Sequence, residues 1–390
     1  MKRNDPFPYN SQYRPSPPRR SSPPPRKNGS AGWLLFSVLV VIAGVCVIFF
    51  TKPYWDGSRD SAAEGSPSVS SSLPTDSTDI PVAASSPSSD VISTDSSTEG
   101  MSTPQPMDAA ARENARAELE LVLQNLLGQK LGRYGLYYLN LETGESIEIH
   151  ARDPFVAASS IKLAYNTYLY QKALGGSFSL DDQMAYNSAA YPDGDFEAGT
   201  GNIQNDANGT LFTLSEISHR SIYLSDNCGT NMILRKLGGI ETVNQEYMMP
   251  ISAVVNYRGK VEYTDFRGAA QSGRNRTSAM DLALYAKNLY SLYQGNKEGY
   301  QPLIDDLSSS SFSWGISAVT PPSGEKVTVA HKIGFNTAYA TNNDAGIVFG
   351  EEDYILAIVT ENNSDTEAQL VIGQASQLVY DYIRAVTGNT

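Results

Sequence analysis

The sequence predicts an α+β domain preceded by one transmembrane helix. Residues 31–51 form one long apolar run. Two strand patterns stand early in the globular segment that follows, and three more stand near its end. Stretches with helical periodicity lie between these strands and at both ends. Early and late strands that share one sheet around a helical insertion are typical of an α+β fold.

The first 108 residues are predicted to hold three segments without a packed core. Residues 1–30 are rich in Pro and contain seven Lys and Arg against one Asp, which indicates a disordered basic tail. Residues 31–51 carry no charge, and about 20 such residues suffice for a helix that crosses a bilayer. Residues 52–108 are rich in Ser, Thr and Pro and predict a disordered linker.

The location of the domain follows from this order. Lys and Arg before an apolar span favour the cytoplasmic side, so we expect a single-pass protein of the cell membrane with a cytoplasmic N-terminus and an extracellular domain. The alternative is a cleaved signal peptide. Against it, the run is longer than the usual apolar region of about 7–15 residues, and no Ala-x-Ala site follows directly.

Composition excludes several classes of function. The net charge is −13, and the acidic residues lie almost entirely after residue 30, so phosphate backbones find no basic surface there. Cys46 lies in the apolar run and Cys228 lies far beyond it, which excludes a disulfide framework. The three His residues show no metal-binding spacing. We therefore expect no nucleic acid, metal or organic cofactor.

Residues 109–390 are predicted to form the single globular domain. Its first helix is indicated by the helical spacing of Leu119, Val122, Leu123 and Leu126. A β-hairpin is predicted next, with strands over 134–141 and 146–150. Later helices are predicted from residue 159 onward and over 229–238 and 277–292. Three strands are predicted over 327–332, 345–349 and 354–360. A last helix is indicated by the spacing of Val371, Ala375, Leu378, Val379 and Tyr382.

The first motif with chemical meaning is Ser-Ser-Ile-Lys at 159–162, at the start of a predicted helix. This spacing places Lys162 one turn from Ser159 on the same face. A serine hydroxyl needs a neighbouring base, and a lysine can serve when burial and nearby charge lower its pKa. The N-terminus of the helix also aims N–H groups at developing negative charge. Alone, the motif is more typical of an N-cap serine with a solvated lysine.

Two further motifs follow. Ser-Asp-Asn at 225–227 precedes an apolar helix and by itself is typical of a helix cap. His-Lys-Ile-Gly at 331–334 lies on a predicted strand that Gly334 ends or bends, and by itself it is typical of a strand lysine before a turn. At the edge of a cleft, the same strand would present the Lys332 ammonium to an anionic substrate and the next backbone N–H to an oxyanion.

Together, the three motifs resemble the Ser-x-x-Lys, Ser-Asp-Asn and Lys-Thr-Gly set of the class A β-lactamase and penicillin-binding-protein superfamily of serine hydrolases. Their order and approximate spacing match. The flanking segments at 139–145, 199–204, 237–239 and 343–348 are similar as well, so the resemblance covers roughly residues 110–388. It implies a β-lactamase/transpeptidase-like fold: an antiparallel sheet flanked by terminal helices, plus an all-helical subdomain.

The resemblance implies three catalytic residues. Ser159 would attack the substrate carbonyl and form an acyl-enzyme. Lys162 would act as the general base or as part of a proton relay. Ser225 would pass a proton to the departing nitrogen.

It also implies a substrate-binding set. Asn227 would hold the side-chain amide of the substrate, and Lys332 would attract its carboxylate and tune Ser225. Gly334 belongs to the substrate-binding strand. The backbone N–H groups of Ser159 and Phe335 would form the oxyanion hole.

The sequence departs from the family pattern at two places. Ile333 stands where the family usually has a threonine, and one hydrogen bond to a charged group contributes about 1.5–3 kcal/mol, so we expect weaker or altered substrate binding. The Glu-x-x-Leu-Asn segment that supplies the deacylating base of the lactamases is absent. Glu262 lies at about the right position, and Asp265 is a second candidate; a surface carboxylate is an equally good interpretation of each. If neither acts, the acyl-enzyme is long-lived.

We therefore predict a membrane-anchored extracytoplasmic serine hydrolase of the class A β-lactamase type, which opens β-lactam amides through Ser159. The alternatives are a penicillin-binding D,D-peptidase or transpeptidase of peptidoglycan, and a non-hydrolysing cell-wall sensor. The expected partners are a small β-lactam or peptidoglycan-peptide substrate and, through the N-terminal helix, the membrane. The catalytic domain is expected to be monomeric.

Overall fold

The computed structural model describes residues 105–253, 263–264, 270–271, 275–312, 314–322, 324 and 326–389. In this part of the chain, no helix combines the length and apolar character that a membrane crossing requires. The predicted basic tail, the predicted span and nearly all of the predicted linker lie outside it.

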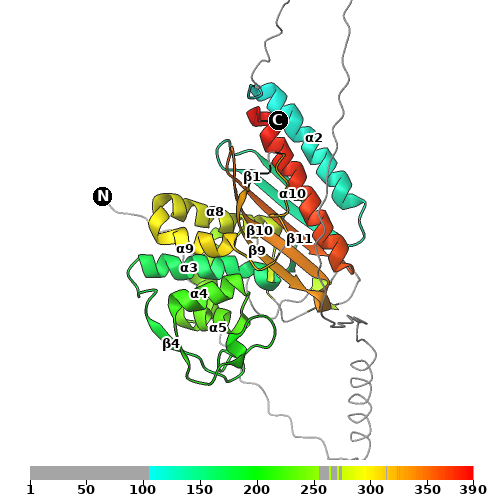
Figure 1. Ribbon diagram of the computed structural model, residues 1–390. Helices are drawn as coiled ribbons and strands as arrows, with labels where there is room; N and C mark the ends of the chain where they lie inside the picture. Colours follow the sequence, from blue (N-terminus) through cyan, green and yellow to red (C-terminus); the bar gives the residue numbers. More distant parts are fainter. Residues whose placement is uncertain are drawn as a thin grey trace, which may run out of the picture. The chain divides into compact units, whose positions relative to one another are not determined.

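Within the described residues, a five-stranded antiparallel sheet occupies the centre of the domain in the order β2-β1-β11-β10-β9 (Figure 1). The first two strands pair with the last one, since Leu136 of β1 lies opposite Ile358 of β11. The prediction of one sheet built from early and late segments is therefore confirmed. The strands are β1 (Arg133–Asn140), β2 (Ser146–Ile149), β9 (Thr328–Asn336), β10 (Thr341–Phe349) and β11 (Tyr354–Glu361).

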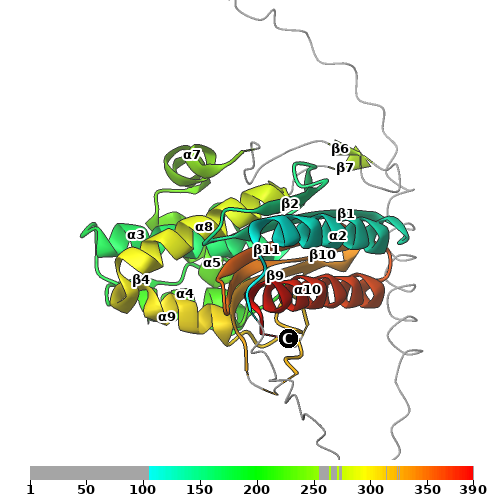
Figure 2. The ribbon, with the colours of Figure 1, turned by 90° about the horizontal axis from the view of Figure 1, so that it is seen from above.

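Two long helices, α2 (Ala109–Gly128) and α10 (Asp365–Thr387), lie side by side on one face of this sheet (Figure 2). Leu119, Leu123 and Leu127 of α2 are buried there. Positions four apart share a face of a helix, which is why these three meet the sheet. The prediction that Val122 belongs to this face is wrong, because its side chain is 41% exposed.

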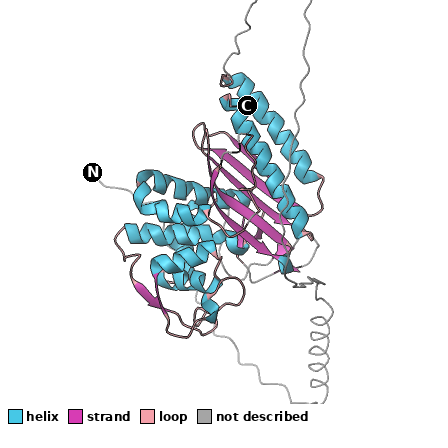
Figure 3. Cartoon of the chain, viewed as in Figure 1, coloured by secondary structure: helices cyan, strands magenta, loops and turns pink. Residues whose placement is uncertain are grey.

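A group of helices covers the other face of the sheet (Figure 3). Alternate residues of β1 divide between the two cores, with Leu136 and Tyr138 toward α2 and α10 and with Tyr137 and Leu139 toward the helical group. Its main members are α3 (Lys162–Leu174), α4 (Leu214–Tyr223), α5 (Asn227–Lys236), α8 (Ala279–Gly295) and α9 (Lys297–Ser308).

Short elements connect these layers. In chain order they are β3 (Phe155–Val156), η1 (Ala158–Ile161), β4 (Gln183–Ala185), η2 (Ile203–Asn205), β5 (Leu211–Thr213), α6 (Ile240–Val243), η3 (Asn244–Met248), α7 (Met249–Ile251), β6 (Tyr263–Thr264), β7 (Ala270–Gln271), β8 (Arg276–Thr277) and η4 (Thr337–Tyr339).

The end of β9 differs from the prediction. Gly334 does not end the strand, because β9 continues to Asn336 and Gly334 lies opposite Asn343 of β10. The glycine is required for a different reason: the backbone of η1 packs directly against it. This contact brings the third motif to the first.

Candidate active site

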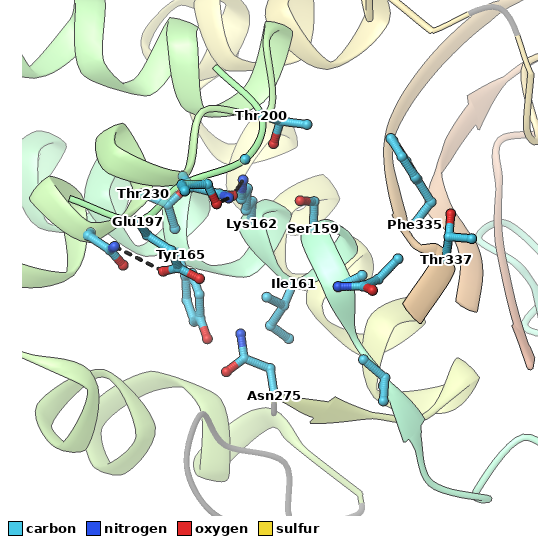
Figure 4. Close-up of a pocket in the computed structure, with 17 residues that line it drawn as sticks. Ser159, Ile161, Lys162, Tyr165, Glu197, Thr200, Thr230, Asn275, Phe335 and Thr337 are labelled. Atoms are coloured by element: carbon cyan, nitrogen blue, oxygen red, sulfur yellow. Dashed lines mark hydrogen bonds between the residues drawn. The ribbon is translucent and has the colours of Figure 1, made fainter. Parts of the chain in front are cut away.

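A cavity of about 400 Å³ lies where the sheet edge meets the helical group (Figure 4). That volume lies within the range of small-molecule sites. Three of the motif residues that the sequence singled out, Ser159, Lys162 and Asn227, line it together with Phe335. Ser225, Lys332 and Gly334 are not among its lining residues, although Ser225 contacts Lys162 and Gly334 packs against the backbone of Ser159.

Ser159 is half-buried in the short helix η1, which runs straight into α3. It does not cap either helix: the cap positions are Ala157 and Ile161, and neither cap uses a side chain. Ala158, just before it, has φ of 47°, a left-handed conformation that costs a non-glycine residue about 1–2 kcal/mol. The backbone thus carries local strain next to the residue predicted as the nucleophile.

Lys162 joins the first motif to the second. Its Nζ donates hydrogen bonds to the Ser225 carbonyl at 2.5 Å and to Asn227 Oδ1 at 2.8 Å, and it lies 3.3 Å from Ser225 Oγ. The side chain is buried, so the interpretation of Lys162 as a solvated surface lysine is wrong. The contact with Ser225 Oγ provides a route for a proton between the two motifs.

Ser225 is buried and adopts φ of 55°, a second left-handed position. Two neighbours hold this turn. Thr200 Oγ1 donates to the Ser225 carbonyl at 2.6 Å, and Asp226 accepts from the N–H groups of Asn202 (2.6 Å) and Gly229 (2.9 Å). Asp226 therefore does cap α5, as the sequence alone suggests. The same cap fixes Ser225 and Asn227 on either side of it.

Asn227 contacts both walls of the cavity. Its Oδ1 accepts from Lys162, and its Nδ2 donates to the Ala198 carbonyl at 3.3 Å. Gly199 follows with φ of 138°, and a Cβ there would lie 2.7 Å from Asn227 Nδ2. The glycine thus leaves room for the asparagine amide.

Lys332 is buried at 1% exposed, and its Nζ donates to the Ile333 carbonyl at 2.9 Å. Burial lowers the pKa of its ammonium from 10.5 to about 7, and the Asp344 carboxylate acts in the opposite direction. Ile333 is also 1% exposed and does not line the cavity. Phe335, Asn336 and Thr337 supply this wall of the cavity instead.

The pKa of Lys332 leads to a test by pH. If its charge attracts a substrate carboxylate, binding above pH 7 requires uptake of a proton. We expect the apparent affinity for a penicillin, obtained from the drug concentration that half-saturates the acylation rate, to weaken about tenfold per pH unit above about pH 7. Lys332→Arg keeps the cation and should flatten this limb. Rapid-quench mass spectrometry from pH 6 to 9 measures the wild type and the Lys332→Arg variant. A wild-type value that does not change with pH would contradict the role of Lys332 in attracting the substrate carboxylate.

The same group affects stability. Between pH 7 and the ordinary lysine pKa of 10.5, the unfolded chain binds this proton and the folded chain does not. The Lys332 contribution to the free energy of unfolding therefore rises with pH through that window.

Gly334 allows the strand to approach the residue predicted as the nucleophile. A Cβ on Gly334 would lie 2.8 Å from Ser159 N and 2.8 Å from the Ala157 carbonyl, and closer still to Ser160 N. Asn343 fastens the same segment by donating to the Ala157 carbonyl at 3.1 Å. Because β9 is an edge strand of the sheet, its outer backbone groups face this segment. The Ser159 N–H therefore lies beside the Gly334–Phe335 backbone.

Several cavity residues were not predicted from the sequence. Tyr165, Thr230 and Asn231 lie on α3 and α5 among the lining residues. Asn231 had a usable signal, since it stands four positions after Asn227 and so shares its helix face. Glu197 and Asn275 come from loops, where no periodicity marks them. Glu262 and Asp265 lie outside the described residues.

The histidines and the described cysteine have ordinary structural settings. His331 is buried against Asp344 at 2.7 Å, His219 contacts Asp306 at 2.7 Å, and His150 is exposed. Cys228 is a buried free thiol. No group of three or more potential metal-ligating side chains is found within the described part of the chain.

This architecture and this site define a class. An α+β domain in which a buried Ser-x-x-Lys helix, a Ser-Asp-Asn turn and a Lys-x-Gly edge strand meet around one cavity is a serine hydrolase of the β-lactamase and penicillin-binding-protein superfamily. A model of the β-lactamase enzyme family matches residues 118–383, which is most of the chain. The chain belongs to the β-lactamase enzyme family.

Individual relatives agree with this placement. The chain is 26% identical over 250 residues to the β-lactamase ROB-1 of Haemophilus influenzae, covering 63% of this chain and 77% of the relative. It is 24% identical over 280 residues to a β-lactamase of Bacillus licheniformis, covering 69% and 85%.

Solved structures share the fold. A variant of PBP-A, determined as an acyl-enzyme complex with penicillin G, gives a TM-score of 0.57 at 24% identity and covers 69% of this chain and 97% of its own. An ancestral class A β-lactamase gives 0.56 at 22% identity and covers 67% and 99%.

Proposed function

We propose that this domain hydrolyses β-lactams through an acyl-enzyme on Ser159. One observation carries the proposal: Lys162, one helical turn from Ser159, contacts Ser225 and Asn227 at the wall of a single cavity. The relatives named above are β-lactamases, which supports a β-lactam as the substrate.

The acylation step follows from these contacts. Ser159 Oγ forms a bond to the lactam carbonyl carbon while its proton passes to Lys162, which must first be neutral. The tetrahedral oxyanion is held by the N–H groups of Ser159 and Phe335. Collapse breaks the amide bond, and the leaving nitrogen takes a proton from Ser225, which is replenished from Lys162. Water then attacks the ester, releasing the acid and restoring Ser159.

We further propose that residues 31–51 anchor the protein in the cell membrane, with the domain outside the cell. The support is the sequence alone: an uncharged apolar run of sufficient length that follows a basic tail. The linker over 52–108 would hold the domain away from the bilayer.

The full chain, incubated with penicillin G, tests the proposed activity. We expect intact-mass spectrometry to show a protein adduct heavier by one drug molecule, whose fraction first increases and then declines. The amount of hydrolysed drug in solution should exceed the amount of protein. A persistent adduct would favour the peptidase or sensor alternative. Absence of both adduct and hydrolysis would reject the β-lactam as substrate.

A further inference from the structure

Hydrolysis of an acyl-enzyme needs a base that takes a proton from water as the water attacks the ester. Lys162 would have to be neutral for this second role as well, whereas a carboxylate is ionised at neutral pH and so can accept a proton without any change of its usual state. A carboxylate that opens onto the same cavity as Ser159 would serve. Among the described residues that line the cavity, Glu197 is the only carboxylate.

Glu197 points into the cavity from the wall that also carries Lys162 and Tyr165 (Figure 4). Its Oε2 accepts a hydrogen bond from Asn231 Nδ2 at 3.0 Å. Asn231 is buried at 1% exposed on α5, one turn after Asn227. The rigid helix that positions Asn227 therefore also orients the Glu197 carboxylate.

The backbone around Glu197 is also held by contacts with α5. Cys228 Sγ contacts the Glu197 N–H at 3.5 Å and its carbonyl at 3.7 Å. Two residues earlier, the buried Asp195 accepts two hydrogen bonds from Arg235, at 2.8 and 2.9 Å. This loop is thus fastened to α5 at both points, which is the rigidity that a base in fixed geometry requires.

A second polar group faces the same space. Asn275 points into the cavity in Figure 4, and its backbone carbonyl accepts from the Ala157 N–H at 2.9 Å, beside the Ser159 segment. Within the described residues, its side-chain oxygen is buried and accepts no hydrogen bond. Because that oxygen is closed off from the cavity, the end of the amide that can contact a water there is its nitrogen, which Figure 4 draws toward the cavity. Asn275 Nδ2 can therefore help to position a water near Glu197.

We propose that Glu197 is the general base of deacylation, acting on a water that Asn275 helps to hold. This inference rests on the proposed function. The water oxygen forms a bond to the ester carbonyl carbon as its proton passes to the Glu197 carboxylate. Collapse of the adduct breaks the bond to Ser159 Oγ, and that oxygen receives the proton. One water is consumed, and both side chains return to their starting state.

The test compares Glu197→Gln with Glu262→Gln and with Glu241→Gln, a control at an exposed position of α6. Glutamine keeps the oxygen that Asn231 binds, so folding should be retained. We expect Glu197→Gln to be acylated by penicillin G within about threefold of the wild-type rate. Its adduct should clear about 10²- to 10⁴-fold more slowly. Glu241→Gln should behave as wild type.

Chemical rescue separates a base from a merely structural residue. Hydroxylamine attacks an ester without help from a base, so it should clear the Glu197→Gln adduct and release the hydroxamate. Glu197→Asp, which keeps the carboxylate, should restore part of the turnover.

The outcomes distinguish the two proposals. A wild-type protein that neither forms an adduct nor hydrolyses the drug removes the proposed function. Wild-type turnover that is unchanged in Glu197→Gln, or a trapped adduct in Glu262→Gln alone, overturns only the role of Glu197. Loss of acylation in folded Glu197→Gln overturns it as well, because the residue would then act in the first step.

Discussion

Replacing Ser159 by alanine is expected to abolish covalent labelling by penicillin G while the domain stays folded. The substitution removes one oxygen from a half-buried side chain that caps neither η1 nor α3, so stability should change little. The same oxygen is the atom proposed to bond to the substrate carbonyl. Loss of a nucleophile reduces turnover by many orders of magnitude, so we expect labelling to slow at least about 10⁴-fold.

The neighbouring serine is a matched control. Ser160 is buried, and its hydroxyl donates to the Ala157 carbonyl at 2.6 Å. Ser160→Ala should lose about 1 kcal/mol of stability and keep its labelling. Intact-mass spectrometry together with thermal denaturation separates the two variants. Labelling of Ser159→Ala at the wild-type rate would remove Ser159 from the mechanism.

Gly334→Ala is expected to have the second-largest effect. The new methyl group would lie 2.8 Å from Ser159 N and from the Ala157 carbonyl, and these backbone atoms cannot rotate out of the way. Either β9 or η1 must move, which displaces the N–H groups proposed for the oxyanion hole. Loss of one such donor costs about 10²- to 10³-fold, so acylation should slow by at least about 10²-fold.

Gly350→Ala provides the comparison. A Cβ at Gly350, just after β10, meets only the Glu352 carbonyl at 3.7 Å, an ordinary contact. Its acylation rate and melting temperature should match the wild type. Stopped-flow acylation kinetics give the rates for both variants. If Gly334→Ala acylated within threefold of the wild type, the close approach of strand and Ser159 would have no part in the reaction.

Much of the fold could be predicted because its elements have clear periodicity. The hairpin at 134–150 and the last helix both match the predicted segments within a few residues. Val122 was misplaced because neighbouring positions on a helix differ by 100°, so one apolar residue at the margin of the buried face is easily assigned to it. Gly334 was misread because sequence alone does not reveal which backbone will pack against a glycine.

The site also contains residues that could be predicted from the sequence and residues that could not. Ser159 and Lys162 stand in one short motif and Ser225 and Asn227 in another, so local spacing places the members of each pair. The contact between the two pairs, from Lys162 to Ser225 and Asn227, is tertiary and was implied only by the family resemblance. Glu197 and the cavity wall after Phe335 are defined by tertiary contacts between loops, and no local pattern encodes such contacts. The burial of Lys332, and with it the lowered pKa, likewise depends on packing by distant segments.

The pairing of β1 with β11 has a consequence for biosynthesis. A ribosome releases β1 long before β11, and until then Leu136 has no Ile358 to face. Every motif has emerged by the time β9 is made, yet β10 and β11, which join β9 to β1 in the sheet, are still missing. During synthesis, the apolar hairpin of β1 and β2 therefore remains without its partner strand and is exposed to misassembly. Folding should be slow and should finish only after synthesis of β11 and α10. Messages truncated before β11 should yield a chain that carries all three motifs and remains inert.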